Sequence, residues 1–300
     1  MSATVSTTCR DGEVTHGGRL PEFVVLGAAK AGTTSLHQYL GRHTYIYMAD
    51  PKEPQFFSRD EVFARGEQWY RSLFAGARPN QVCGEGSTTY TRWPHTADAA
   101  TRLCAMLPDV RLIYLMRHPV DRAYSHYAHH MRLGVTKSFE RALAQDEIYV
   151  DCSLYMKQLE RYLRFLPREL ILPLLTQDLQ ERRRETLEQV QRFLDVPVEP
   201  IAEPPINANV SGSDHFIRRY TTGLVRRLPG SSAVVGRVAP QTRQRAFQWI
   251  KRSPVGRLLA RGHRLPPMTP QVRAMLLARF REPNRELEAF LGRSLAHWSR

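Results

Sequence analysis

A lysine between two glycines marks the most chemically informative stretch of the sequence. Gly27 and Gly32 bound a loop of small residues that contains Lys30, and this loop follows the apolar run 23–26. A segment with helical periodicity begins at about Thr33. The first N–H groups of a helix have no partner within the helix and carry part of its dipole, so small residues there let a phosphate approach them closely. We therefore predict a phosphate-binding loop between a buried strand and a helix.

The loop differs from the nucleotide-binding loop of ATP- and GTP-hydrolysing proteins. In those proteins a lysine follows the second glycine directly. Here Thr33 takes that place, and Lys30 lies inside the loop. The loop therefore predicts a phosphate ligand held in a different way.

A second candidate binding residue, Arg117, follows the mostly apolar run 110–116 and precedes a helix that opens at Pro119. Nucleotide kinases carry a metal-binding carboxylate at the end of the neighbouring strand. An arginine there does not suit a metal, but its planar fork of donors suits a second phosphate. Ser125, on the polar face of the predicted helix, could donate to the same anion. The implied ligand has two separated phosphate-like groups and no dedicated metal.

Strand and helix patterns alternate along the chain. This alternation predicts an α/β fold, a P-loop-like three-layer sandwich with a central parallel sheet flanked by helices. Strands are expected at 23–26, 110–116 and from 170. Helices are expected from about 33, over 119–132, up to 166, around 187–194, from 269–270, and in a separate closing segment around 287–291.

Two of these helices carry expectations about which side chains face the core. In the helix at 119–132, Arg122 is expected on the polar face that also carries Ser125, His129 and Arg132. In the helix after 269, the residues expected inward are Val272, Met275, Leu276 and Phe280.

The composition indicates one domain with appendages. The chain has 300 residues, of which 42% are hydrophobic, and contains no apolar run long enough to span a membrane. Residues 1–19 are expected to be a disordered lead-in to a domain at 20–300. Four widely spaced cysteines favour reduced thiols and a cytoplasmic protein over a metal site or a disulfide scaffold.

The net charge of +14 is concentrated in one segment. Between 214 and 264 there are twelve Lys and Arg and one acidic residue. We interpret the surrounding region, about 201–267, as a basic lid or substrate-side region that faces water, an anionic acceptor or a membrane surface.

The two phosphate motifs together resemble those of sulfotransferases that use 3′-phosphoadenosine 5′-phosphosulfate (PAPS). The segment 30–35 is similar to that family's 5′-phosphosulfate loop, and 117–125 to its 3′-phosphate motif, with arginine and serine eight residues apart. Within the family, 52–57 and 84–90 resemble motifs of the carbohydrate, heparan-sulfate-type branch and its bacterial relatives. A late nucleotide-contacting loop of that branch resembles 261–266.

The resemblance implies roles for residues of both motifs. Lys30 would stabilise charge on the bridging oxygen of the leaving 5′-phosphate, without a metal. PAPS would be the donor and 3′-phosphoadenosine 5′-phosphate (PAP) the product. The residues implied in donor binding are Lys30, Ala31, Gly32, Thr33, Thr34, Ser35, Arg117, Ser125, Arg261, Gly262, His263, Arg264 and Leu265.

The acceptor side rests on the same resemblance. Glu53 aligns with the glutamate that serves as base in the heparan-type branch, and His95 is a weaker candidate because other branches use a histidine. Glu85, in the segment 84–90, is left open between an isolated loop acid and a functional one. Gly86 stands where the heparan-type enzymes carry a second catalytic lysine, which makes polymeric heparan a doubtful acceptor.

The resulting prediction is sulfuryl transfer to a hydroxyl, with an amine as second choice, on a glycan, glycolipid or natural product. Two other functions are kept beside it. One is a P-loop phosphotransferase that uses ATP and Mg²⁺. The other is a non-enzymatic protein that binds polyanions, which the high positive net charge would favour. No recognised nucleic-acid-binding motif is present in the sequence. The oligomeric state stays open.

Overall fold

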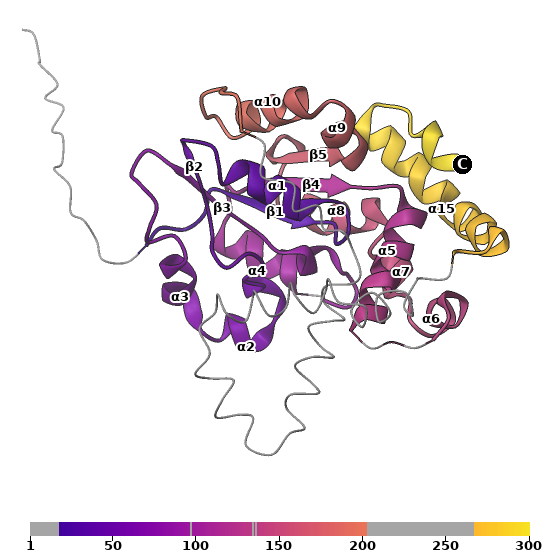
Figure 1. Cartoon of the computed structure of the whole chain (residues 1–300). Coiled ribbons are helices and arrows are strands. Elements are labelled where there is room, and N and C mark those ends of the chain that lie inside the picture. Colours follow the sequence, from indigo (N-terminus) through magenta and orange to yellow (C-terminus); the bar gives the residue numbers. More distant parts are fainter. Residues whose placement is uncertain (1–17, 97, 134, 136, 203–266) are drawn as a thin grey trace, which may run out of the picture.

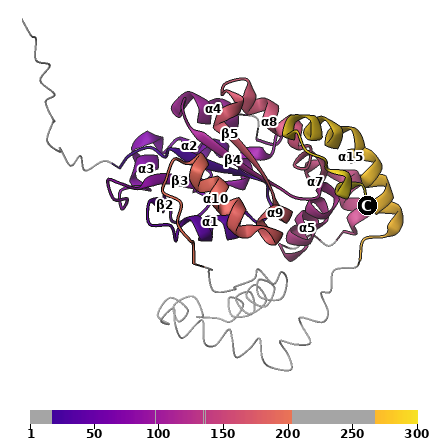
Figure 2. The same cartoon turned by 90° about the horizontal axis from the view of Figure 1, so that it is seen from above.

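The protein is a three-layer sandwich with a parallel sheet in the middle (Figure 1). The computed structural model describes residues 18–96, 98–133, 135, 137–202 and 267–300. Helices α1, α9 and α10 cover one face of the sheet, and α4 and α8 cover the other (Figures 1 and 2). The predicted fold class is confirmed. Residues 1–17 of the predicted lead-in and 203–266 of the basic region lie outside the described residues.

The strands are β1 Phe23–Gly27, β2 Ile46–Met48, β3 Val82–Gly86, β4 Arg111–Met116 and β5 Ile171–Leu175. The helices are α1 Thr33–Leu40, α2 Asp60–Phe63, α3 Gly66–Ser72, α4 Ala99–Met106, α5 Pro119–Arg132, α6 Phe139–Gln145, α7 Ile148–Asp151, α8 Tyr155–Leu163, α9 Thr176–Glu181, α10 Arg183–Phe193 and α15 Pro270–Leu291. Short 3₁₀ helices are η1 Phe56–Ser58, η2 Thr88–Thr91, η3 Arg168–Leu170 and η4 Ala296–Ser299.

The strand order, β2-β3-β1-β4-β5, decides where the site lies. All four strand pairs are parallel, so every strand ends at the same edge of the sheet. From β1 the chain goes first to one side, to β2 and β3, and then to the other, to β4 and β5. In open α/β sheets, ligands bind outside the carboxyl ends of the strands at this change of direction. The loop after β1 occupies that position.

The central strand is buried along its whole length, as a strand covered on both faces must be. Phe23 pairs with Gly84 of β3, and a Cβ at Gly84 would lie 2.1 Å from the Phe23 ring. The glycine therefore makes room for the ring. Pro173, which cannot donate to a neighbouring strand, lies in β5 at the end of the strand order.

The C-terminal region differs from its prediction in two respects. A single helix, α15, replaces the two that were expected, and it continues through Pro283 to end at Gly292, which has a φ of 63°. Burial of Phe280 before the proline and Leu287 after it holds the two halves together. Met275 is 50% exposed rather than inward, because it lies about 60° outside the helical stripe of the buried residues.

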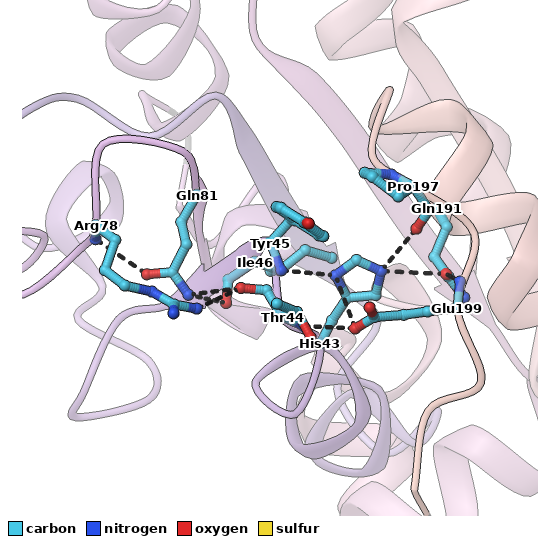
Figure 3. A network of polar contacts seen from close by, with 9 residues as sticks. All are labelled: His43, Thr44, Tyr45, Ile46, Arg78, Gln81, Gln191, Pro197 and Glu199. Atoms are coloured by element: carbon cyan, nitrogen blue, oxygen red, sulfur yellow. Dashed lines mark hydrogen bonds and ion pairs between the residues drawn. The ribbon is translucent and has the colours of Figure 1, made fainter.

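A polar cluster ties the segment after α10 to the β2 edge of the sheet (Figure 3). The Nε2 atom of His43 lies 3.1 Å from Gln191 Oε1 and 3.0 Å from the Pro197 carbonyl oxygen, while its Nδ1 accepts from the Tyr45 N–H at 3.1 Å. These partners require the tautomer with the proton on Nε2. Glu199 accepts from the Thr44 N–H at 2.6 Å. The chain up to residue 199 is thereby fixed beside β2.

Candidate active site

The predicted phosphate loop connects β1 to α1, and its backbone opens toward the edge of the sheet where the strands end. Lys30 and Gly32 have positive φ angles of 72° and 95°. Gly32 precedes α1, and no side chain caps that helix end. The first N–H groups of α1 are thus left for a ligand. Thr33 is buried, Thr34 is half-buried and Ser35 is exposed.

The carbonyl oxygens of this loop are held by side chains from elsewhere in the fold. Arg122 donates to the Ala29 oxygen at 3.5 Å, Arg117 to the Lys30 oxygen at 3.4 Å, and Thr176 to the Ala31 oxygen at 2.6 Å. The C=O and N–H of a trans peptide point in opposite directions. The amides of residues 30 and 32 therefore face away from these side chains.

Arg117 joins the two predicted phosphate motifs. It directly follows β4, and the Tyr155 hydroxyl fixes its backbone by accepting from its N–H at 3.2 Å and donating to its carbonyl oxygen at 2.6 Å. Its guanidinium reaches the Lys30 carbonyl. Ser125 lies half-buried on α5, the helix that follows Arg117. Arg261, Gly262, His263, Arg264 and Leu265 lie outside the described residues.

The expectation that Arg122 belongs to the polar face of α5, away from its packing stripe, is wrong. Its side chain is fully buried and donates to Ser153 Oγ and to the carbonyl oxygens of Tyr149 and Ala29. Burial and the Arg122 charge lower the pKa of His126 well below its usual range, which leaves a neutral ring facing the guanidinium at 3.3 Å. The buried guanidinium thus donates to carbonyl oxygens of two segments, the loop after β1 and α7.

Glu53, the predicted base, lies in the loop between β2 and η1. Its Oε1 pairs with Lys52 Nζ at 2.6 Å, and its Oε2 accepts from Thr88 Oγ1 at 3.1 Å. The side chain is 28% exposed, so a reactant can reach the carboxylate. Burial and the Lys52 charge lower the pKa of nearby His37, on α1, to about 4, which keeps that ring neutral at pH 7.

Glu85 is the least expected feature of the site. It lies in β3 with no exposed surface and accepts from Tyr70 at 3.3 Å and from Ser87 at 2.9 Å. Burial raises the pKa of Glu85 to about 7. The sequence left its role open. Residues two apart in a strand share a face, so Glu85 lies on the same face of β3 as the buried Cys83.

The other predicted acceptor-side residues lie as follows. His95 pairs with Asp151 at 3.0 Å, whereas the contacts of Glu53 are with Lys52 and Thr88. Gly86 pairs with Val25, and a Cβ there would lie 3.3 Å from the Val25 Cβ, which is a tight contact. Among the described residues, no group of three or more His, Cys, Asp or Glu is arranged to hold a metal ion.

Comparison with known proteins identifies the family. The Sulfotransferase domain family matches residues 20–214. The chain belongs to this family. The two nucleotide motifs had predicted a sulfotransferase, and that prediction is confirmed.

Three similar sulfotransferases show the extent of the likeness. A crystallised sulfotransferase from Alicyclobacillus acidocaldarius is 27% identical with a TM-score of 0.66, covering 94% of this chain and 100% of its own. The bifunctional heparan sulfate N-deacetylase/N-sulfotransferase 3 of Mus musculus is 26% identical over 94% of this chain. The human heparan sulfate glucosamine 3-O-sulfotransferase 6 is 34% identical over 50% of it. The matches span 31% and 44% of those two curated relatives.

No helix in the described part of this sulfotransferase is long and apolar enough to cross a membrane. The described cysteines Cys83, Cys104 and Cys152 are free and buried.

Replacing Thr176 by valine tests whether its hydroxyl supports the predicted phosphate loop. The hydroxyl contacts both the Ala31 oxygen and, at 3.0 Å, the Met116 oxygen at the end of β4. Loss of a buried hydrogen bond of about 1 to 1.5 kcal/mol should weaken PAP binding roughly five- to tenfold in calorimetric titration. The matched control is Thr186→Val in α10, which removes a hydrogen bond from the Thr186 hydroxyl to the Arg182 carbonyl oxygen. Equal PAP affinity in Thr176→Val and the wild type would remove Thr176 from this role.

The raised pKa of Glu85 predicts how stability depends on pH. Because the group binds its proton more tightly in the folded protein, its contribution to stability is present below about pH 4.5 and is lost as pH rises through about 7. Urea unfolding of the wild type should show an extra loss on the order of 3 kcal/mol between these pH values, which Glu85→Gln lacks. Exposed Glu160→Gln is the control. Parallel pH profiles for wild type and Glu85→Gln would contradict the assignment.

Proposed function

We propose that this chain transfers a sulfuryl group from PAPS to a hydroxyl, with an amine as second choice, of a glycan, glycolipid or natural product. One observation carries the proposal. The Arg117 guanidinium touches the Lys30 carbonyl at 3.4 Å, which puts the two predicted anion-binding motifs side by side at one edge of the sheet. A nucleotide with phosphates at both the 3′ and 5′ positions suits that arrangement. The similarity to heparan sulfate sulfotransferases supports a sugar-like acceptor.

The residues around the loop fit the donor. The amides at the start of α1, with the hydroxyls of Thr33, Thr34 and Ser35, would hold the 5′-phosphate. Arg117 and Ser125 would hold the 3′-phosphate, since an arginine fork matches phosphate oxygens. The bound donor supplies an activated sulfuryl group whose leaving group is a phosphate.

Lys30 would act where negative charge increases during transfer. A fixed ammonium near the departing oxygen is worth more in the transition state than in the ground state, so it raises the rate. A sulfuryl group carries one negative charge where a phosphoryl group carries two, so its transfer needs less neutralisation. A lysine in the loop meets that need.

Glu53 would remove the proton of the acceptor hydroxyl. An alcohol is a weak nucleophile at neutral pH, and a positioned base speeds its attack. Lys52 and Thr88 each hold one oxygen of the carboxylate, which restricts its orientation. A further lone pair on each oxygen stays available to accept the proton.

The two other functions find less support. A phosphotransferase of the P-loop type would use a carboxylate at the end of the neighbouring strand, where β4 is followed by Arg117. The charge-rich segment that suggested a polyanion-binding protein lies outside the described residues. No contact in the described part favours either function over sulfuryl transfer.

Replacing Glu53 by glutamine tests the proposal. With labelled PAPS and an acceptor extract, kcat should fall by about 10²- to 10⁴-fold, the usual contribution of a general base. The PAP dissociation constant should stay within about twofold, because Glu53 lies on the acceptor side of the site. Glu61→Gln removes an exposed, arginine-paired carboxylate of α2 and should leave both values unchanged. A parallel loss of PAP binding in Glu53→Gln would show a structural role instead.

A further inference from the structure

Glu85, a buried carboxylate near the end of β3, accepts hydrogen bonds from several hydroxyl groups. The Tyr70 and Ser87 hydroxyls donate to its two oxygens at 3.3 and 2.9 Å. A side-chain hydrogen bond from Tyr90 also acts on Glu85. All four residues are buried, and a carboxylate in such a place must have its lone pairs satisfied.

Two of these hydroxyls have a second contact, with the backbone of the loop that carries Glu53. Ser87 Oγ accepts from the Gln55 N–H at 3.0 Å, and Tyr90 Oη accepts from the Phe57 N–H at 3.4 Å. A hydroxyl has a single proton to donate. When Ser87 and Tyr90 each donate a hydroxyl hydrogen bond to Glu85, their oxygen lone pairs are left to accept from the Gln55 and Phe57 amides. The carboxylate therefore sets the direction of the whole chain of bonds.

The loop needs such support because its backbone is strained. Glu53 and Gln55 have φ angles of 60° and 57°, in the left-handed region that disfavours residues with a side chain. Each such residue costs on the order of 1 kcal/mol or more and persists only where the surroundings hold it. The Gln55 amide, which donates to Ser87, lies two residues from Glu53. Thr88, the residue after Ser87, donates to the Glu53 carboxylate itself.

We propose that Glu85 is a positioning residue for Glu53, which acts by fixing the proton direction of Ser87 and Tyr90 and through them the backbone at 55 and 57. This inference rests on the proposed role of Glu53 as base. A glutamine at 85 would present an amide N–H to a hydroxyl oxygen. That oxygen would then have to accept from the glutamine as well as from a loop amide.

Two further titratable groups lie near Glu85. Besides Tyr70 and Tyr90, these titratable neighbours of Glu85 are Tyr162 on α8 and Glu53 itself. Burial raises the pKa of each of the three tyrosines above its ordinary value, so all three stay neutral donors at pH 7. In its ionised form, Glu85 is thus the acceptor on which these bonds converge.

The first test is amide hydrogen exchange, which does not depend on activity. In Glu85→Gln, exchange at Gln55 and Phe57 should accelerate at least tenfold, while the amides of β1 keep their wild-type rates. Ser87→Ala should accelerate Gln55, and Ser87→Thr, which keeps the hydroxyl, should restore its protection. Unchanged exchange at both amides in Glu85→Gln overturns the inference, whatever the activity.

The second test separates positioning from general loss of structure. Glu85→Gln and Ser87→Ala should lower kcat at least tenfold with PAP affinity within twofold of wild type, and Ser87→Thr should recover most of the loss. In the Glu53→Gln background the same substitutions should cause no further loss. Losses that multiply with Glu53→Gln overturn the inference. If the exchange result holds while Glu53→Gln keeps wild-type kcat, the proposed role of Glu53 fails instead.

Discussion

The structure depends on the way the loop after β1 is held from behind. Three consecutive carbonyl oxygens, at residues 29, 30 and 31, accept hydrogen bonds from Arg122, Arg117 and Thr176. These side chains come from α5, the end of β4 and the start of α9, elements that are distant in sequence. Their convergence turns the amides of residues 30 and 32 away from these side chains. The sheet topology and these three donors together therefore shape the predicted anion site.

The same contacts add positive charge around the site. Arg122 is buried among neutral acceptors, namely a hydroxyl, two carbonyls and a neutral imidazole. Hydrogen bonds satisfy its donors but do not cancel its charge. A charge in such surroundings is screened less than one in water, and this one contacts the loop directly. An anionic ligand at the loop would gain from it.

The acceptor side is built by a similar device with the opposite sign. Glu85 gathers hydroxyl donors, and through them the carboxylate orders the strained loop at 53–55. In both halves of the predicted site, one fully buried ionisable group therefore lies behind a loop that carries predicted site residues. In both, the buried group acts on backbone atoms and not on a reactant.

The sequence predicted what depends on local pattern. The strand beginning at Phe23, the helix opening at Pro119 and the cap at Thr269 follow from apolar period, proline and capping chemistry, and the structure has all three. The pattern failed where tertiary contacts decide. Arg122 is assigned to a polar helix face because nothing nearby in sequence shows that Ser153 and the Ala29 carbonyl will meet it. The last two helices are expected to be separate because the packing of Phe280 and Leu287 is not local.

The predicted site shows the same division. The neighbouring positions of Lys30 and Arg117 follow from the rule that parallel strands end at one edge, whereas the role of Glu85 depends on hydroxyls from two elements. Ser87 is close to Glu85 in sequence, but Tyr70 and the amides of Gln55 and Phe57 are not, so spacing alone does not show the role.

Two predicted anion sites meet where Arg117 contacts the loop after β1. Calorimetric titration of the wild-type protein with PAP and with adenosine 5′-phosphate, in buffer containing a chelator, tests it directly. The account predicts that PAP binds about tenfold to a hundredfold more tightly, because the 3′-phosphate adds a charge-assisted contact of roughly 1.5 to 3 kcal/mol. Equal affinities for the two nucleotides would contradict it.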